Sequence, residues 1–262
     1  MRLNFEVQGD GPALLILHGL FGSLENWHGM ARRLSAHFKV FSIDQRNHGR
    51  SPHVPEMNYE LMAGDVLSLM QEAGLARAHV LGHSMGGKTA MQLALAHGQA
   101  VDQLVVADIA PKAYPPHHDQ IIKALLSVDF LKIKSRRDLD AALAPSIPDT
   151  AVRQFLIKDA KPVDGSFKWQ MNIKAIAENY PHLLAAPSPG GQFAGPTLFV
   201  CGENSDYITT EDHALIRKLF PASIFEVIPG AGHWLHAEAP EAFFRIVRDF
   251  LLGGETSGEA GG

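Results

Sequence analysis

The stretch "VLGHSMGGKTA", residues 80–90, places a serine between glycines and decides the fold class. An apolar run precedes the serine and good helix formers follow it, so the chain passes from a strand into a helix through a very short turn. Gly82 and Gly86, two residues to either side of Ser84, suit a backbone with no room for larger side chains. This context predicts that Ser84 is an exposed nucleophile rather than a serine that only helps the chain to turn.

Short apolar runs alternate with amphipathic helical stretches on both sides of this turn. The runs at residues 13–17, 39–43, 78–82 and 103–110 are rich in Val, Ile and Leu, which is typical of strands buried on both faces of a sheet. Residues 57–74 repeat apolar side chains at helical spacing. This repeated order of strand and helix predicts an α/β protein with a mostly parallel central sheet flanked by helices.

The order of strand and helix is interrupted between Pro111 and Gly195. Proline-rich segments and several amphipathic helical stretches fill this interval, without a convincing buried strand. An excursion of this length is too long for a plain loop. We therefore predict a core formed by residues 1–110 and 196–252, a helical cap over residues 111–195, and a flexible, glycine-rich tail over residues 253–262.

The composition argues against several classes of function. The 262 residues carry a formal net charge of −5 and no block of Lys or Arg, so no nucleic-acid partner is expected. No apolar segment is long enough for a signal peptide or a transmembrane helix, and the lone cysteine, Cys201, has no intrachain partner for a disulfide. We expect a cytoplasmic protein without membrane contact, either a monomer or a small homo-oligomer.

The general base must be chosen from 14 histidines. His233 follows a strand and a Gly-Ala-Gly loop and precedes the last helix, so its side chain can lean over the carboxyl edge of the sheet, where Ser84 stands. It also comes after Ser84 in the chain. His236 and Glu238 lie nearby, but no further ligands complete a metal site. We predict no metal and no cofactor.

Five motifs carry a resemblance to a known family: "LLILHGLFGS" (14–23), "DQRNHGRS" (44–51), "GHSMGGK" (82–88), "VVADIAP" (105–111) and "GAGHWLHAEAP" (230–240). Together they make the chain similar to the α/β-hydrolases, and within them to the serine carboxylesterases of the YbfF-like and ABHD11-like kind. The resemblance implies an α/β-hydrolase fold with the cap inserted after the sixth strand. It also implies an oxyanion hole made by the backbone N–H groups of Met85 and Leu20, with Phe21 as the alternative to Leu20.

The resemblance leaves two candidates for the acid that orients His233. Asp206 follows a strand where many α/β-hydrolases carry the acid, but one position later than their usual Gly-x-x-Asp spacing, with Ser205 in the expected place. Asp108 ends the preceding strand, a second location that some members use. A carboxylate that ends an apolar strand needs a partner, because burying it alone is costly. We favour Asp108 and keep Asp206 as the alternative.

These residues predict a serine carboxylesterase that acts on a small-molecule ester. It would hydrolyse short-to-medium acyl esters, thioesters included, through a Ser-His-Asp triad and an acyl-enzyme. We expect Phe21, His83, Trp169 and Trp234 to line the substrate pocket, and Lys88 to be a partly exposed helix residue. Two alternatives stay open: a carbon–carbon bond hydrolase or lyase that acts on an acidic substrate with the same triad, and a slow-turnover ligand receptor with a hydrolase fold.

Overall fold

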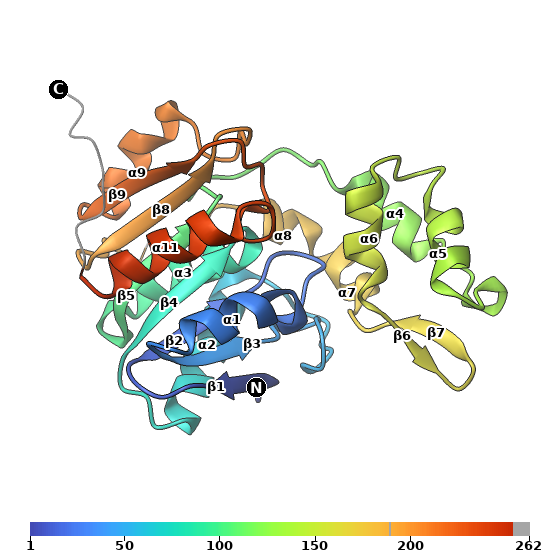
Figure 1. The fold of residues 1–262 in the computed structure, drawn as a ribbon, viewed down its shortest axis with the longest axis horizontal. Coiled ribbons are helices and arrows are strands. Elements are labelled where there is room, and N and C mark those ends of the chain that lie inside the picture. The colour runs from blue at the N-terminus through green and yellow to red at the C-terminus, as the bar shows by residue number, and fades with distance from the viewer. Residues whose placement is uncertain (189, 254–262) are drawn as a thin grey trace.

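A seven-stranded sheet forms the centre of the computed structural model, which describes residues 1–188 and 190–253 (Figure 1). The predicted tail therefore lies outside the described residues from position 254 onward. The strand order is β1-β3-β2-β4-β5-β8-β9; β1 runs antiparallel to β3, and all other neighbours are parallel. The strands are β1 (Phe5–Gln8), β2 (Ala13–Leu17), β3 (Lys39–Ile43), β4 (Ala78–His83), β5 (Val101–Ala107), β8 (Thr197–Gly202) and β9 (Ser223–Ile228).

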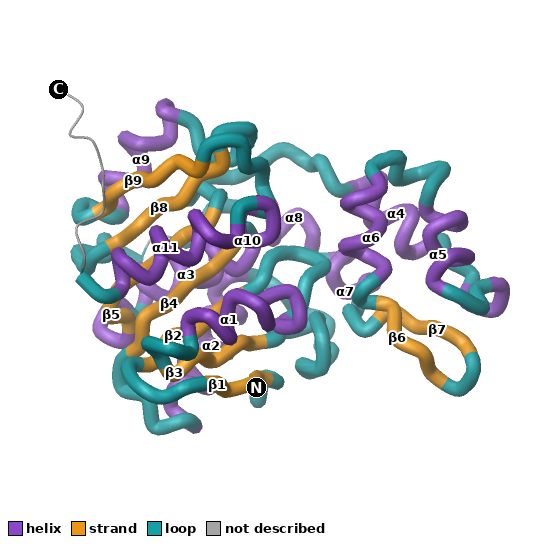
Figure 2. Tube along the Cα trace, viewed as in Figure 1, coloured by secondary structure: helices purple, strands orange, loops and turns teal. Residues whose placement is uncertain are grey.

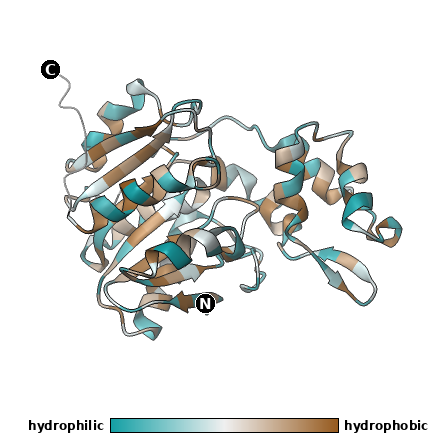
Figure 3. Ribbon diagram, in the orientation of Figure 1, coloured by the Kyte–Doolittle hydropathy of each residue, from teal (hydrophilic) through white to brown (hydrophobic). Residues whose placement is uncertain are grey.

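Helices cover both faces of the sheet, because successive side chains of a strand point to opposite faces. Leu15 and Leu17 of β2 share one core with the helices of the first face, whereas Leu14 and Ile16 share another with those of the second. Figures 2 and 3 show this layered arrangement and the apolar strands between the helices. The first face carries α2 (Tyr59–Glu72), α3 (Met85–Ala96) and α9 (His213–Leu219), and the second carries α1 (His28–Leu34) and α11 (Pro240–Leu251).

Several short helices complete the core. The four-residue helix α10 (Leu235–Glu238) precedes α11, and 3-10 turns occupy Leu24–Trp27, Gly98–Ala100 and Thr210–Asp212. Among the described residues, no helix combines the length and the apolar character needed to cross a bilayer. The predicted α/β class, with its mostly parallel sheet and flanking helices, is confirmed.

The chain inserted between β5 and β8 forms a cap over residues 119–178, which lies to the right in Figure 1, and its apolar side chains share one cluster with Phe21, Tyr59 and Met85 of the α/β core. The insertion follows β5, the fifth strand of the chain, and not a sixth strand as expected. Its elements are α4 (Asp119–Leu126), a 3-10 turn (Phe130–Lys132), α5 (Arg136–Leu143), α6 (Thr150–Ile157), β6 (Ala160–Val163), β7 (Ser166–Trp169), α7 (Ile173–Glu178) and α8 (Tyr180–Leu184).

The cap contains a β-hairpin that the sequence pattern did not predict. β6 and β7 pair antiparallel around Asp164 and Gly165, which have φ of 49° and 78°. A two-residue turn with both φ values positive matches the twist of a hairpin, and Asp-Gly is a preferred sequence for it. Most residues of the two strands are half-buried or exposed, so they lack the apolar run by which the buried strands were identified.

The sheet brings three loops to one edge. The parallel strands β4, β5, β8 and β9 are neighbours in that order, so their carboxyl ends meet at the side of the sheet nearest the cap. Ser84 directly follows β4, Asp108 directly follows β5, and His233 lies in the loop between β9 and α10. The fold therefore gathers the candidate nucleophile, acid and base from positions far apart in the sequence.

Candidate active site

The turn at Ser84 has the strained geometry that the sequence predicted. Ser84 has φ 52° and ψ −118°, and its backbone N–H donates to the Ala107 carbonyl at 3.0 Å. A Cβ atom added to Gly82 would lie 2.1 Å from the Gly86 carbonyl oxygen, and one added to Gly86 would lie 2.2 Å from the Leu17 carbonyl oxygen. No side chain fits at either position. The two glycines therefore let the chain turn sharply and present Ser84 at the start of α3.

Asp108 and His233 form a close pair beside Ser84. The Nδ1 atom of His233 lies 2.7 Å from Oδ2 of Asp108, whose side chain is fully buried. Because a carboxylate only accepts hydrogen bonds, Nδ1 carries the proton and Nε2 is left to accept one. The Gly202 N–H donates to Oδ1 of Asp108 at 3.2 Å, and the Ser205 hydroxyl donates to Oδ2. These donors, together with the imidazole, offset the cost of burying the carboxylate.

Asp206, the alternative acid, is exposed on the loop after β8. Its neighbours on that loop contact the pair instead: Ser205 bonds Asp108, and the Tyr207 ring stacks on the His233 ring at 4.0 Å between centroids and 16° between planes. We did not predict these two contacts. The signal for the first was present in the sequence, since Ser205 occupies the position at which related enzymes usually carry their acid.

The candidate oxyanion donors lie in the turn after β2 and at the start of α3. Met85 is the first residue of α3, where backbone N–H groups have no partner within the helix. The Phe21 N–H donates to Nε2 of His48 at 3.2 Å, so this group is already engaged. Leu20 lines the same cavity as Ser84. Of the two expected alternatives, the geometry favours Leu20 over Phe21 as the partner of Met85.

Two buried histidines hold the Leu20 turn in place. Nε2 of His18 accepts the Gln45 N–H at 3.0 Å, while its Nδ1 lies 2.8 Å from the Gly19 carbonyl. His48 makes the matching pair of bonds, to Phe21 N–H and to the Arg46 carbonyl. Burial lowers the pKa of His18 to about 4 and the pKa of His48 to about 3. Both rings are therefore neutral near pH 7, and each uses one nitrogen as donor and the other as acceptor.

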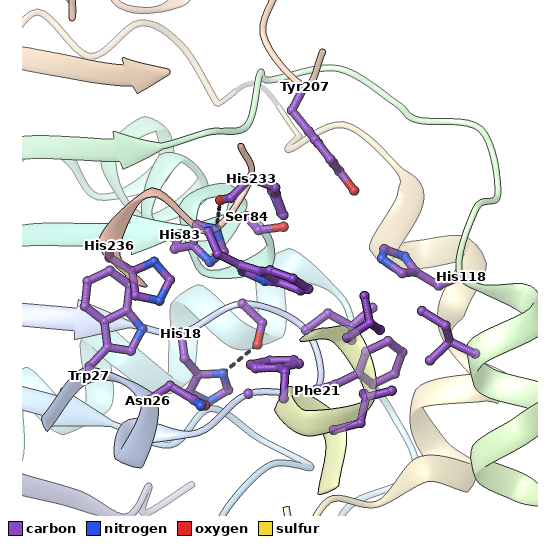
Figure 4. A pocket seen from close by; sticks show the side chains of 18 residues that line it. His18, Phe21, Asn26, Trp27, His83, Ser84, His118, Tyr207, His233 and His236 are labelled. Carbon is purple, nitrogen blue, oxygen red and sulfur yellow. Dashed lines mark hydrogen bonds between the residues drawn. The ribbon is translucent and has the colours of Figure 1, made fainter. Parts of the chain in front are cut away.

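Ser84 and His233 open into a catalytic cavity of 190 Å³ between core and cap (Figure 4). Phe21, His83 and Trp234, three of the four residues expected in the substrate pocket, line this cavity. The cap side is apolar, and Figure 4 shows His118 on the chain that enters the cap, across the cavity from His233. The cap residues that line the cavity include Ile121, Val152, Phe155 and Leu156.

Trp169 does not line this cavity, and the prediction that it does is wrong. Its ring packs edge-on against Phe130, and its Nε1–H donates to the Leu125 carbonyl at 3.0 Å. Both partners belong to the cap. An aromatic residue of the inserted segment can face either the cap core or the active site, and here the hairpin turns Trp169 into the cap core.

Two further side chains of this region are buried near Ser84. Nε2 of His83 lies 2.9 Å from the His233 carbonyl oxygen, so the residue before the candidate nucleophile donates to the backbone of the candidate base. Lys88 is 2% exposed, which contradicts the expectation of partial exposure. Its Nζ donates to the carbonyls of Leu184 and Ala185 at 3.1 and 2.7 Å, and burial lowers its pKa to about 7. Lys88 thus joins α3 to the end of α8.

Comparison with known proteins places the chain in a family. A model described as the alpha/beta hydrolase fold matches residues 12–132. The sn-1-specific diacylglycerol lipase ABHD11 of Mus musculus is 38% identical, with 94% of this chain and 83% of that protein covered. Esterase YbfF of Escherichia coli is 35% identical, with 96% and 99% covered. A solved structure, a marine microorganism esterase, is 41% identical, with a TM-score of 0.92 over 95% of this chain and 99% of its own. The chain therefore belongs to the α/β-hydrolase family and is an ester hydrolase.

Proposed function

We propose that this chain hydrolyses carboxylic esters of small molecules with short-to-medium acyl groups, thioesters included, through an acyl-enzyme on Ser84. One observation carries the proposal: His233 is held by Asp108 at 2.7 Å and lines the same cavity as Ser84. A nucleophile, a base and an acid that orients the base are the three parts that serine hydrolysis needs.

Acylation begins with the Ser84 hydroxyl, which gives its proton to Nε2 of His233 as its oxygen attacks the ester carbonyl. The carbonyl oxygen becomes an oxyanion and receives hydrogen bonds from the backbone N–H groups of Leu20 and Met85. His233 then gives the proton to the leaving alcohol or thiol. The bond between the carbonyl carbon and the leaving group breaks, and the acyl group stays on Ser84.

Water completes the cycle by the same route. His233 takes a proton from the water, whose oxygen attacks the acyl-enzyme, and the second oxyanion occupies the same hole. The proton returns to the Ser84 oxygen as the carboxylic acid leaves. Asp108 keeps Nδ1 protonated throughout and stabilises the imidazolium that forms in both steps.

The proposal is tested with a fluorophosphonate probe and with p-nitrophenyl esters. The wild type should be labelled rapidly and should release nitrophenol, and Ser84→Ala should lose labelling and about six orders of magnitude in kcat. Ser127→Ala is the matched control, because Ser127 is an exposed serine at the end of α4, and it should retain both activities. A Ser84→Ala variant that still hydrolyses esters would contradict the proposal. Rapid labelling of the wild type without ester turnover would instead favour the receptor alternative.

A further inference from the structure

Ser84 lies where two cavities meet. Beside the catalytic cavity of 190 Å³ is a second space of 40 Å³, called the small cavity below. Four residues line both: Leu20, Ser84, His118 and Tyr207. Figure 4 shows Ser84, His118 and Tyr207 around the catalytic cavity. These four residues form the boundary between the two cavities. An ester bound at Ser84 can therefore place one of its two chains in each cavity.

The catalytic groups are divided unequally between the two cavities. Among the described residues, His233 lines the catalytic cavity and is absent from the lining of the small cavity, whereas Met85 shows the reverse. The leaving oxygen must receive its proton from His233, so the alcohol has to lie on the His233 side, in the catalytic cavity. The acyl chain, on the other side of the same carbonyl carbon, is then directed into the small cavity.

The small cavity limits the length of that acyl chain. The small cavity offers 40 Å³, so a short acyl chain fits in it, whereas a long one would have to push its walls apart. The catalytic cavity is nearly five times as large and has apolar walls on its cap side.

Polar contacts keep the walls of the small cavity from moving apart. The Tyr59 hydroxyl donates to the Leu183 carbonyl at 2.6 Å, and the Lys88 ammonium holds the Leu184 carbonyl, the next along α8. At the start of α8, the Tyr180 hydroxyl accepts the backbone N–H of His118 at 2.9 Å. Each of these groups lines the small cavity or holds a residue that does. Widening the cavity would break buried hydrogen bonds, and unsatisfied buried groups are costly.

From this geometry we infer that the enzyme is selective for esters in which a short acyl group, such as acetyl or butanoyl, is joined to a larger apolar alcohol. The inference rests on the proposed function and narrows it from short-to-medium to short acyl groups. It also assigns the two sides of the ester to the two cavities.

Two measurements on the wild type test the inference. In a series of p-nitrophenyl esters, kcat/KM should hold from acetate to butanoate and fall at least about tenfold at hexanoate. Hexyl acetate and ethyl hexanoate are isomers that exchange the long and short chains, and hexyl acetate should be preferred at least about tenfold. Equal or greater activity on ethyl hexanoate would overturn the inference while fluorophosphonate labelling still upheld the proposed function. Absence of both labelling and ester hydrolysis would instead refute the proposed function itself.

A matched pair of variants locates the limit in the structure. Leu183 lines only the small cavity and Val152 lines only the catalytic cavity, among the described residues. Leu183→Ala should raise the ratio of hexanoate to butanoate hydrolysis by roughly tenfold, and Val152→Ala should change it by less than about twofold. Rates are divided by the fraction of protein that a fluorophosphonate labels, so partial misfolding does not affect the ratio. If Val152→Ala relaxes the acyl limit and a folded Leu183→Ala does not, the assignment of the cavities is wrong.

Discussion

The loops after β5 and β8 each carry an aspartate at the carboxyl edge of the sheet, but the two aspartates differ in burial and in their contacts. Asp108 is fully buried and bonded to His233, whereas Asp206 is exposed. The loop after β8 supports the pair instead, through the Ser205 hydroxyl and the Tyr207 ring. In the proposed triad, the position of the acid in the chain is therefore less constrained than its position in space, because any loop that reaches Nδ1 of His233 can supply it.

Among changes in these two loops, replacing the two aspartates in turn should show the largest difference in kcat. Asp108→Asn should lower kcat about 10⁴-fold, because an amide at this position favours the wrong histidine tautomer. Asp206→Asn should stay within about twofold of the wild type, as a change at an exposed group normally does. The measurement is kcat on p-nitrophenyl acetate, with labelling to count active sites. A severe loss in Asp206→Asn would reverse the roles of the two loops.

The loop after β2 is held in a different way. The neutral rings of His18 and His48 hold this loop, whereas the Asp108 carboxylate holds His233. The pKa of His18 falls from 6.5 to about 4 in the folded protein. Between these values the unfolded chain binds the proton and the folded protein does not, so the free energy of unfolding decreases as the pH drops from 6.5 to 4. Over this whole pH range, His18 alone should lower the free energy of unfolding by about 3 kcal/mol.

Urea unfolding at several pH values measures this effect. His18→Gln should be less stable than the wild type at pH 7, because it loses buried hydrogen bonds, and its stability should depend less on pH between 6.5 and 4. An unchanged pH dependence in His18→Gln would show that His18 is not responsible.

A smaller effect is expected at Ser205. Ser205→Ala removes one donor to the buried Asp108 carboxylate but leaves the Gly202 N–H and His233 in place. A hydrogen bond to a charged group contributes about 1.5–3 kcal/mol, so kcat should fall by roughly ten- to a hundredfold. Ser205→Thr keeps a hydroxyl and serves as the rescue control. A Ser205→Ala variant with wild-type kcat would mean that the loop after β8 gives the acid no support.

Local constraints made part of the site predictable from the sequence. At Gly82 the crowding is local, because the carbonyl of Gly86 in the same turn leaves no space for a Cβ atom, whereas at Gly86 it comes from the Leu17 carbonyl of β2. The choice of acid was harder, because it depends on how far each loop reaches. The sequence still held a clue, since Ser205 occupies the usual place of the aspartate.

Long-range packing explains the expectations that failed. Lys88 is buried by carbonyls 96 and 97 residues further along the chain, and Trp169 bonds a carbonyl 44 residues earlier. Contacts between residues so far apart in the sequence leave no periodic pattern around Lys88 or Trp169. The hairpin of the cap was missed for a related reason: its strands are short and partly exposed, so they lack the apolar run of a buried strand.

The smallest expected effect concerns Tyr207, whose ring lies parallel to the His233 ring at 4.0 Å. The face of an aromatic ring attracts a cation, so this contact should stabilise the imidazolium that forms in each transition state. Tyr207→Leu should therefore lower kcat by about two- to tenfold, whereas Tyr207→Phe should retain most of it. The Tyr207 hydroxyl also contacts Nε2 of His117 at 2.6 Å, on the chain that enters the cap. If Tyr207→Phe loses as much kcat as Tyr207→Leu, this link to the cap, and not the stacked ring, is what the loop after β8 contributes to the base.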